Sequence, residues 1–236
     1  MMSFQQSTKS LRELSRRAAL IALTTGAAGL LSGCGLLHGK PTFRFRMTVE
    51  LQTVKGLKSG SSVMEYYSHK EPALLPEEGS GFRAGISRGE AVVVDAPSGP
   101  IFALLTMSNG SADIDVLGAF APELWDRPWE EKMAAVRRLS SEDGIKVTLP
   151  RAGWPMMVRF ADANDPSSVE RVDPAAIGVK RILLETTNED VTVGIQKRLR
   201  WLHDGGLTLD PDGGPTITPT FAQTIRQRAF TTEIPR

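Results

Sequence analysis

The chain contains only one cysteine and three histidines among its 236 residues. A single cysteine, Cys34, excludes a disulfide within the chain and a cysteine-based zinc site. The histidines His38, His69 and His203 are far apart in the sequence, and none forms an H-x-x-x-H pair. We therefore expect no metal centre, and we interpret the histidines as solvated residues of irregular segments.

The chain also lacks an excess of either charge. Its 28 Lys and Arg residues against 27 Asp and Glu residues give a net charge of +1. Residues 1–33 hold four of the basic residues and one of the acidic residues, so residues 34–236 carry 24 basic and 26 acidic residues, a net charge near −2. This balance argues against nucleic-acid binding and against a basic surface that docks on membranes.

No apolar run is long enough for a permanent membrane span. The Ala- and Leu-rich uncharged run at residues 18–31 has fourteen residues, whereas a spanning helix needs about 20. It follows a basic stretch that contains Lys9, Arg12, Arg16 and Arg17. This combination is typical of a secretory signal peptide, and we predict that residues 1–33 are removed on export.

The end of this leader resembles the lipobox of bacterial lipoproteins. It reads Leu31-Ser32-Gly33-Cys34. The resemblance implies a diacylglyceryl group on the Cys34 thiol, cleavage just before Cys34, and membrane attachment through the lipid. Residues 34–41 would then be the lipidated cysteine and a tether. Gly35 is not the Asp that favours inner-membrane retention in enterobacterial lipoproteins, so we expect the outer membrane, facing the periplasm.

The leader also carries a candidate export motif. Residues 15–20, Ser-Arg-Arg-Ala-Ala-Leu, resemble the twin-arginine signal through Arg16 and Arg17, although Ala19 stands where that motif usually has an aromatic residue. Basic leaders of the general secretory route also contain Arg-Arg pairs by chance. Both export routes therefore remain open.

Residues 42–236 are expected to form a single domain, since about 200 residues can bury a full core and no linker or repeat interrupts them. Apolar and polar residues alternate from Phe43 to Gln52, which predicts a strand with one buried face. Gly56 and Gly60 indicate a turn, and residues 61–68 read as the returning strand. Residues 90–95 and 101–107 do not alternate and flank a Pro/Gly turn, which predicts a hairpin near the centre of a sheet, covered on both faces.

The remaining segments predict helices and further strands. Trp129, Met133, Val136 and Leu139 recur at helical spacing after Asp126, a candidate N-cap, so we expect one amphipathic helix there. Strands are expected at 145–149, 156–160 and 180–187, short helices at 194–202 and 220–230, and a turn at 210–214. The fold class is α+β, with a mainly antiparallel sheet built from hairpins and helices packed on it.

Several strings together resemble a family of uncharacterised proteobacterial proteins, many of them small lipoproteins. They are FRFRMTVELQTVKGLKSGSS from Phe43, RGEAVVVD from Arg88, FALL from Phe102, DANDPSSVERVDP from Asp162, KRILLETT from Lys180 and VTVGIQKRLRWL from Val191. The strings span nearly all of residues 42–236 in order. The segment after Ile177 is shorter than is typical of that family. The resemblance implies relatedness, and it implies no activity, cofactor or partner.

The densest acidic stretch, around Asp162, Asn164 and Asp165, is the candidate interaction loop. Oxygen ligands at alternate positions could hold calcium. However, Pro166 occupies the place where an EF-hand loop needs a ligand, and the bending glycine is missing. Asn-Asp-Pro-Ser is also a strong turn string, because Asn and Asp side chains bond to their own backbone. We favour the turn and keep calcium binding as the alternative.

Motifs for catalysis are missing or misplaced. No G-x-x-x-x-G-K-[ST] phosphate loop occurs. Residues 85–89 fit G-x-S-x-G around Ser87, but a nucleophile elbow needs a strand before it and a helix after it, and here a loop-like segment precedes and a strand-like run follows. We therefore expect no cofactor and a non-catalytic binding or structural role, with an envelope protein as a possible partner. A periplasmic hydrolase with a site assembled from scattered residues is the alternative.

Overall fold

The structure, a computed structural model, describes residues 41–71, 81–108, 110, 113–203, 208–210 and 218–233. The expected leader, with Arg16, Arg17 and Cys34, lies outside the described residues, as do His38 and most of the expected turn at 210–214. In the described part, no helix is long and apolar enough to cross a membrane.

The first hairpin consists of β1 (Thr42–Thr53) and β2 (Gly56–Glu71). The predicted buried face of β1 is confirmed, since its five apolar side chains from Phe43 to Leu51 are at most 3% exposed. The turn was misplaced by the prediction, because the chain reverses at Val54 and Lys55 and Gly60 lies inside β2. A Cβ atom at Gly60 would lie 1.9 Å from the carbonyl oxygen of Val93. Gly60 therefore lets β4 (Val92–Ala96) approach β2 closely.

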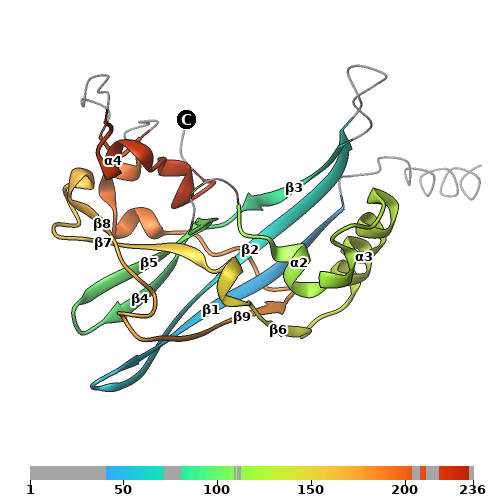
Figure 1. Cartoon of the computed structure of the whole chain (residues 1–236), viewed down its shortest axis with the longest axis horizontal. Helices are drawn as coiled ribbons and strands as arrows, with labels where there is room; N and C mark the ends of the chain where they lie inside the picture. The colour runs from blue at the N-terminus through green and yellow to red at the C-terminus, as the bar shows by residue number, and fades with distance from the viewer. Residues whose placement is uncertain are drawn as a thin grey trace, which may run out of the picture. The chain divides into compact units, whose positions relative to one another are not determined.

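Two antiparallel sheets form, where the sequence had indicated one. The first has the order β3-β2-β1-β9-β6 and the second has the order β4-β5-β7-β8. Figure 1 shows the long first hairpin crossing the domain, with the second sheet beside it. The bounds of the further strands are β3 (Gly81–Arg88), β5 (Gly99–Met107), β6 (Lys146–Thr148), β7 (Pro155–Phe160), β8 (Val169–Arg171) and β9 (Val179–Thr186).

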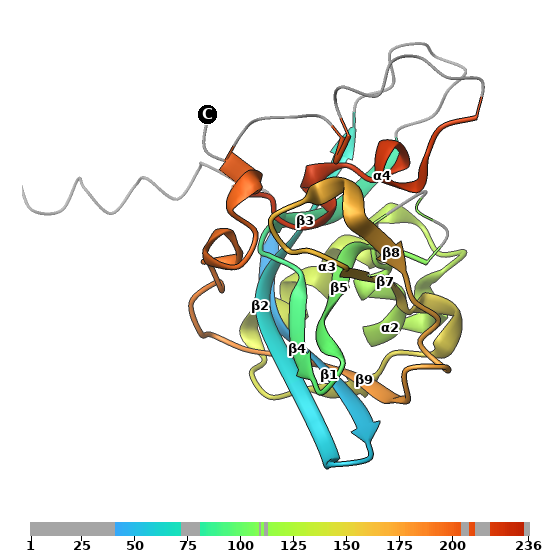
Figure 2. The same ribbon diagram turned by 90° about the vertical axis from the view of Figure 1, so that its left-hand side faces the viewer.

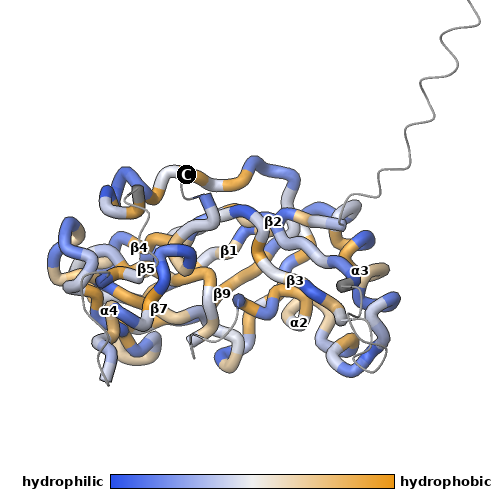
Figure 3. Tube along the Cα trace, turned by 90° about the horizontal axis from the view of Figure 1, so that it is seen from above, coloured by the Kyte–Doolittle hydropathy of each residue, from blue (hydrophilic) through white to orange (hydrophobic). Residues whose placement is uncertain are grey.

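The surroundings of the β4–β5 hairpin explain why apolar and polar residues do not alternate along its strands. Ile101, Ala103 and Leu105 of β5 join the core shared with the first sheet, while Phe102 and Leu104 join a second core against the C-terminal segments. The prediction of burial on both faces is confirmed for β5, which is an inner strand. The central position predicted for β4 is wrong, because β4 is an edge strand of the second sheet and packs against β2 instead. The apolar inner strands are visible in the hydropathy-coloured trace of Figure 3.

Helices lie beside the first sheet at one end of the domain (Figures 1 and 2). They are α2 (Val116–Phe120), the 3-10 helix η1 (Pro122–Leu124) and α3 (Trp129–Ser141). Helix α3 buries Met133, Ala135, Val136 and Leu139, and it contacts β1 and β2. The predicted N-cap Asp126 is wrong: Pro128 occupies the N-cap position without a side-chain hydrogen bond.

The C-terminal segments are shorter turns of helix than the sequence suggested. The expected helix at 194–202 is two 3-10 helices, η4 (Ile195–Lys197) and η5 (Arg200–His203), and Ile195, Leu199 and Leu202 are buried. The expected helix at 220–230 is α4 (Phe221–Thr224) followed by η6 (Gln227–Ala229). A capping box between Thr220 and Gln223 starts α4, since each side chain accepts a backbone N–H of the other. Two further 3-10 helices in the described part are η2 (Arg151–Gly153), which precedes β7, and η3 (Pro166–Ser168), which precedes β8.

Candidate functional site: an apolar pocket

The candidate interaction loop is exposed and hydrogen-bonded to itself. Oδ1 of Asp162 accepts the backbone N–H of Asn164 at 2.9 Å. Oδ1 of Asp165 accepts the hydroxyl of Ser167 at 2.6 Å and its backbone N–H at 2.9 Å, and these bonds hold the pKa of Asp165 below its ordinary value. These are the bonds of an Asx turn. Across the described ranges, no group of three or more His, Cys, Asp or Glu side chains is arranged to hold a metal ion.

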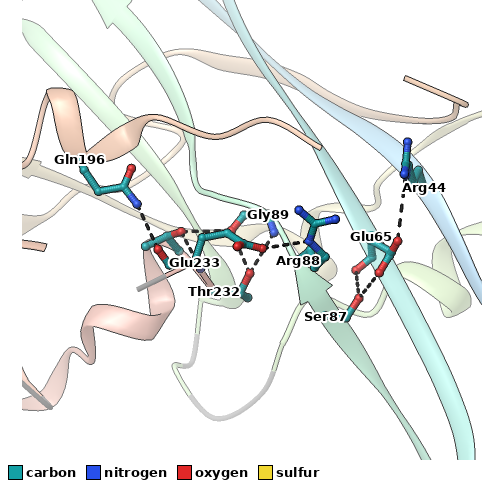
Figure 4. A network of polar contacts seen from close by, with 9 residues as sticks. Arg44, Glu65, Ser87, Arg88, Gly89, Gln196, Thr232 and Glu233 are labelled. Atoms are coloured by element: carbon teal, nitrogen blue, oxygen red, sulfur yellow. Dashed lines mark hydrogen bonds and ion pairs between the residues drawn. The ribbon is translucent and has the colours of Figure 1, made fainter. Parts of the chain in front are cut away.

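Ser87 of the G-x-S-x-G string lies within β3, not on a turn between strand and helix. Its hydroxyl is within bonding distance of Oε1 of Glu65 at 2.9 Å and of the Glu65 carbonyl oxygen at 3.1 Å (Figure 4). Arg44 lies 4.0 Å from the same carboxylate. The hydroxyl therefore cross-links β2 and β3, and the geometry is not that of a nucleophile elbow.

The second part of the network in Figure 4 fastens the C-terminal segment to the end of β3. Arg88 forms an ion pair with Glu233 at 3.0 Å, and the backbone N–H of Gly89 donates to the Thr232 hydroxyl at 3.0 Å. The side-chain amide of Gln196 donates to the carbonyl of Glu233 at 3.2 Å. These contacts join three distant parts of the chain, which is a structural role.

The prediction that the histidines are solvated residues of irregular segments is wrong for His69. His69 was expected in a loop, but it lies in β2, half-buried, with its ring stacked on Tyr67 at a centroid distance of 5.7 Å. The backbone of His203 ends η5, and its side chain lies outside the described part. Among the described side chains, His69 belongs to no group of metal ligands.

An apolar pocket of about 430 Å³ lies where β2 and β3 meet the helices α2, η1 and α3. Its size falls within the range of roughly 300–1,000 Å³ found for small-molecule sites. Most of its wall consists of large apolar side chains from five separate segments, namely Tyr66, Phe82, Met107, Leu117, Leu124 and Trp125. The pocket therefore offers an apolar ligand a mainly apolar surface.

The two carboxylates in the wall are used by the fold. Oδ1 of Asp115 accepts the backbone N–H of Gly118 at 2.9 Å and caps α2. Oδ2 of Asp113 accepts the backbone N–H of Ile86 at 3.4 Å. A Cβ atom at Gly85 would lie 2.6 Å from this oxygen, so glycine is needed for Asp113 to reach β3. Neither carboxylate is presented with a nucleophile to activate among the described lining residues.

Burial sets the chemistry of Tyr66, which is 4% exposed. Desolvation raises the pKa of its hydroxyl well above the ordinary value, and the charges of Asp115 and Asp113 add to the rise. The hydroxyl therefore stays neutral at all physiological pH values. It supplies a polar group to the wall without adding charge.

The mouth of the pocket combines an aromatic and a cation. Trp125 is 71% exposed, which is unusual for so large an apolar side chain. Nζ of Lys132, on α3, donates to the backbone carbonyl of Trp125 at 2.8 Å and lies 5.7 Å from the ring centroid of Phe82. Lys132 thus ties together the three segments that surround the opening.

Sequence inspection missed this pocket. Its residues come from segments that are distant in the chain, and each residue also fits the strand, helix or loop in which it lies. No single segment therefore indicates a pocket. The one available signal was Trp125, which lies four residues before Trp129 in a stretch of charged residues and prolines. No family model matches the chain, and neither a curated protein nor a solved structure matches it.

Proposed function

We propose that the chain is a lipid-anchored protein of the bacterial envelope whose domain binds an apolar group, without catalysis, in the pocket below Trp125. The anchor is the lipid on Cys34 that the lipobox implies, after export and removal of residues 1–33. The pocket supplies the binding site. We place the protein on the outer membrane, facing the periplasm, because Gly35 follows the lipidated cysteine.

The observation that carries the binding role is the apolar pocket itself. It is open at one side, its wall is mainly aromatic and aliphatic, and the described lining offers no nucleophile with a base beside it. Trp125 is exposed at the mouth, and its large ring is available for an apolar contact with a ligand there.

The position of the pocket supports a ligand taken from a membrane surface. Tyr66 of the pocket wall pairs with Phe43, the second residue of β1, so the pocket lies near the point where the tether enters the domain. From Cys34 to Pro41 the chain can span at most about 25 Å. A pocket held that close to the lipid bilayer can reach apolar groups exposed at its surface.

We further propose that α3 is an amphipathic helix that closes one side of the pocket. Met133, Val136 and Leu139 are buried, while Glu130, Arg137 and Arg138 are exposed. This arrangement lets the apolar face of α3 cover the first sheet while its first turn carries Lys132 to the mouth.

A photoactivatable probe tests the binding role on the full chain in its own membrane. The probe is octyl glucoside with a diazirine in the octyl chain. This molecule is uncharged, and its octyl chain is the apolar end. We expect adducts on Leu124 and Trp125. Ala84→Trp places an indole inside the pocket, because Ala84 lines it, and should reduce these adducts at least about fivefold.

Ala134→Trp is the matched control, since Ala134 is exposed on α3 and is not part of the pocket wall. It should leave the labelling unchanged. Labelling of the exposed Val193 as strong as that of Trp125, or the same loss in both variants, would contradict the proposed binding site.

A further inference from the structure

A second concave surface, with the opposite chemistry, adjoins the apolar pocket. It is a groove of about 750 Å³ between the end of β5, β7, β8 and the segments α4 and η6. The groove and the pocket share Asp113 in their walls. Three arginines line the groove, namely Arg171, Arg226 and Arg228, and we call it the arginine groove.

The local fold directs two of these arginines outward together. Gln227 and Ala229 are buried, while Arg226 and Arg228 between and beside them are exposed. The backbone of Arg226 forms a bridge with Thr208, and its carbonyl accepts the backbone N–H of Ala229 at 2.9 Å. The backbone that carries both guanidinium groups is therefore held in place on the groove side.

The third arginine is held by the opposite wall. The guanidinium of Arg171, on β8, donates to the backbone carbonyl of Ser108, which follows β5. This contact leaves its remaining donors available. Thr106 and Thr224 add hydroxyl groups to the wall, although the hydroxyl of Thr224 donates to the Phe221 carbonyl at 2.7 Å.

The charges of the arginine groove are not balanced by neighbouring acids. Within the described ranges, none of its three arginines forms an ion pair, whereas ion pairs with Asp or Glu engage Arg44, Arg46, Arg88, Arg127, Arg159, Arg181 and Arg198. The one acid in the described wall is Asp113, whose carboxylate accepts from the backbone of Ile86 in β3. Three positive charges against one negative charge leave the wall with a net charge of +2.

We propose that the arginine groove binds a phosphate-bearing ligand that is larger than inorganic phosphate and carries at least two negative charges. Planar guanidinium groups donate two parallel hydrogen bonds to phosphate oxygens, and such charge-assisted bonds are the strong ones. The volume of the groove leaves room for more than a single phosphate group. The phosphate belongs either to a soluble compound or to a lipid headgroup, and the two sources share this chemistry.

Pyrophosphate is the probe, titrated by calorimetry into the full chain held in bilayer discs of phosphatidylcholine. We expect binding that weakens with added salt, because the contacts are ionic. The double variant Arg226→Gln, Arg228→Gln should weaken it at least about tenfold. The control Arg137→Gln, Arg138→Gln removes the same charge from the exposed face of α3, outside the groove, and should change the affinity less than about twofold.

Discs that contain cardiolipin, a lipid with two phosphate groups and two negative charges, distinguish the two sources. Weaker pyrophosphate binding in these discs assigns the groove to a lipid headgroup, and unchanged binding assigns it to a soluble phosphate compound. Absence of pyrophosphate binding in neutral discs would overturn the proposal, as would equal losses in the two double variants. Since all four arginines are exposed, both variants should melt at the temperature of the parent.

Discussion

The rings of Phe43 and Tyr66 lie 5.2 Å apart, centroid to centroid, at an interplanar angle of 45°. Phe43 is the second residue of the first strand, and Tyr66 is part of the pocket wall. Phe43 also contacts Phe120 of α2 edge-on at 5.8 Å. The start of β1 is therefore packed directly against the proposed binding site.

Phe43→Ala should destabilise the domain by about 3–5 kcal/mol, because it opens a cavity next to Tyr66 and Phe120. Phe43→Leu keeps most of the volume and should cost less than about 2 kcal/mol. Denaturant titration measures both. A loss below about 1 kcal/mol for the alanine variant would show that the aromatic cluster is not part of the stable core.

The two faces of β1 should respond very differently to charge. Val49 is fully buried, so Val49→Asp places an unpaired carboxylate in the core and should cost at least about 4 kcal/mol or unfold the domain. Thr48 points to the opposite, half-buried face, and Thr48→Asp should cost less than half as much. Equal losses in denaturant titration would be incompatible with the observed register.

Stability should depend on pH through Glu90. Burial raises the pKa of this carboxyl, although the backbone N–H groups of Ile195, at 2.8 Å, and Gly194 lower it in part. Because its pKa is raised in the folded state, Glu90 ionises in the unfolded chain at a lower pH than in the folded chain. The free energy of unfolding therefore falls as the pH rises from the ordinary carboxyl pKa of 4.5 to the folded pKa. Above the folded pKa, this contribution is constant.

Glu90→Gln removes this titration and keeps an acceptor oxygen for Ile195. The free energy of unfolding of the variant should therefore improve relative to the parent as the pH rises from about 4 to about 8. Denaturant titrations of both proteins across this range measure the difference. A relative gain by the parent with rising pH would show that ionised Glu90 is favoured in the folded state.

The loop at Asp162 and Asp165 should not respond to calcium, because its carboxylates already accept bonds from their own backbone. Ligand at a hundredfold excess over its dissociation constant would add about 2.7 kcal/mol, which corresponds to roughly 5–10 °C in melting temperature for a domain of this size. We expect a shift within error in millimolar calcium. A calcium-specific rise that Asp162→Ala abolishes would instead make this loop a metal site.

The strands that the sequence predicted best are those whose pattern is local. The alternation from Phe43 to Leu51 needs only one buried and one wetter face, and the structure has both. The unbroken run of β5 follows from its position between two cores. The division into two sheets could not be predicted, because it depends on pairings such as Val49 with Ile182, and no local pattern encodes which strands meet.

The start of α3 and the pocket could not be predicted from the sequence, for physical reasons. Asp126 is a good N-cap by type, yet Pro128 occupies that position, because several residues before an apolar repeat can start a helix equally well. The pocket wall joins Tyr66, Phe82, Asp113 and Trp125 through tertiary packing alone. Asp113 reaches β3 only because position 85 is glycine, and no local sequence pattern encodes this dependence.

The most direct test of a membrane-anchored binding domain is the incorporation of labelled palmitate into the chain in a bacterial host that processes lipoproteins. Cys34 is the only cysteine, so no other thiol can accept the diacylglyceryl group. We predict labelled protein in the membrane fraction for the parent. For Cys34→Ser we predict an unlabelled chain that is uncut or differently cut. Undiminished palmitate labelling of Cys34→Ser would contradict the anchor.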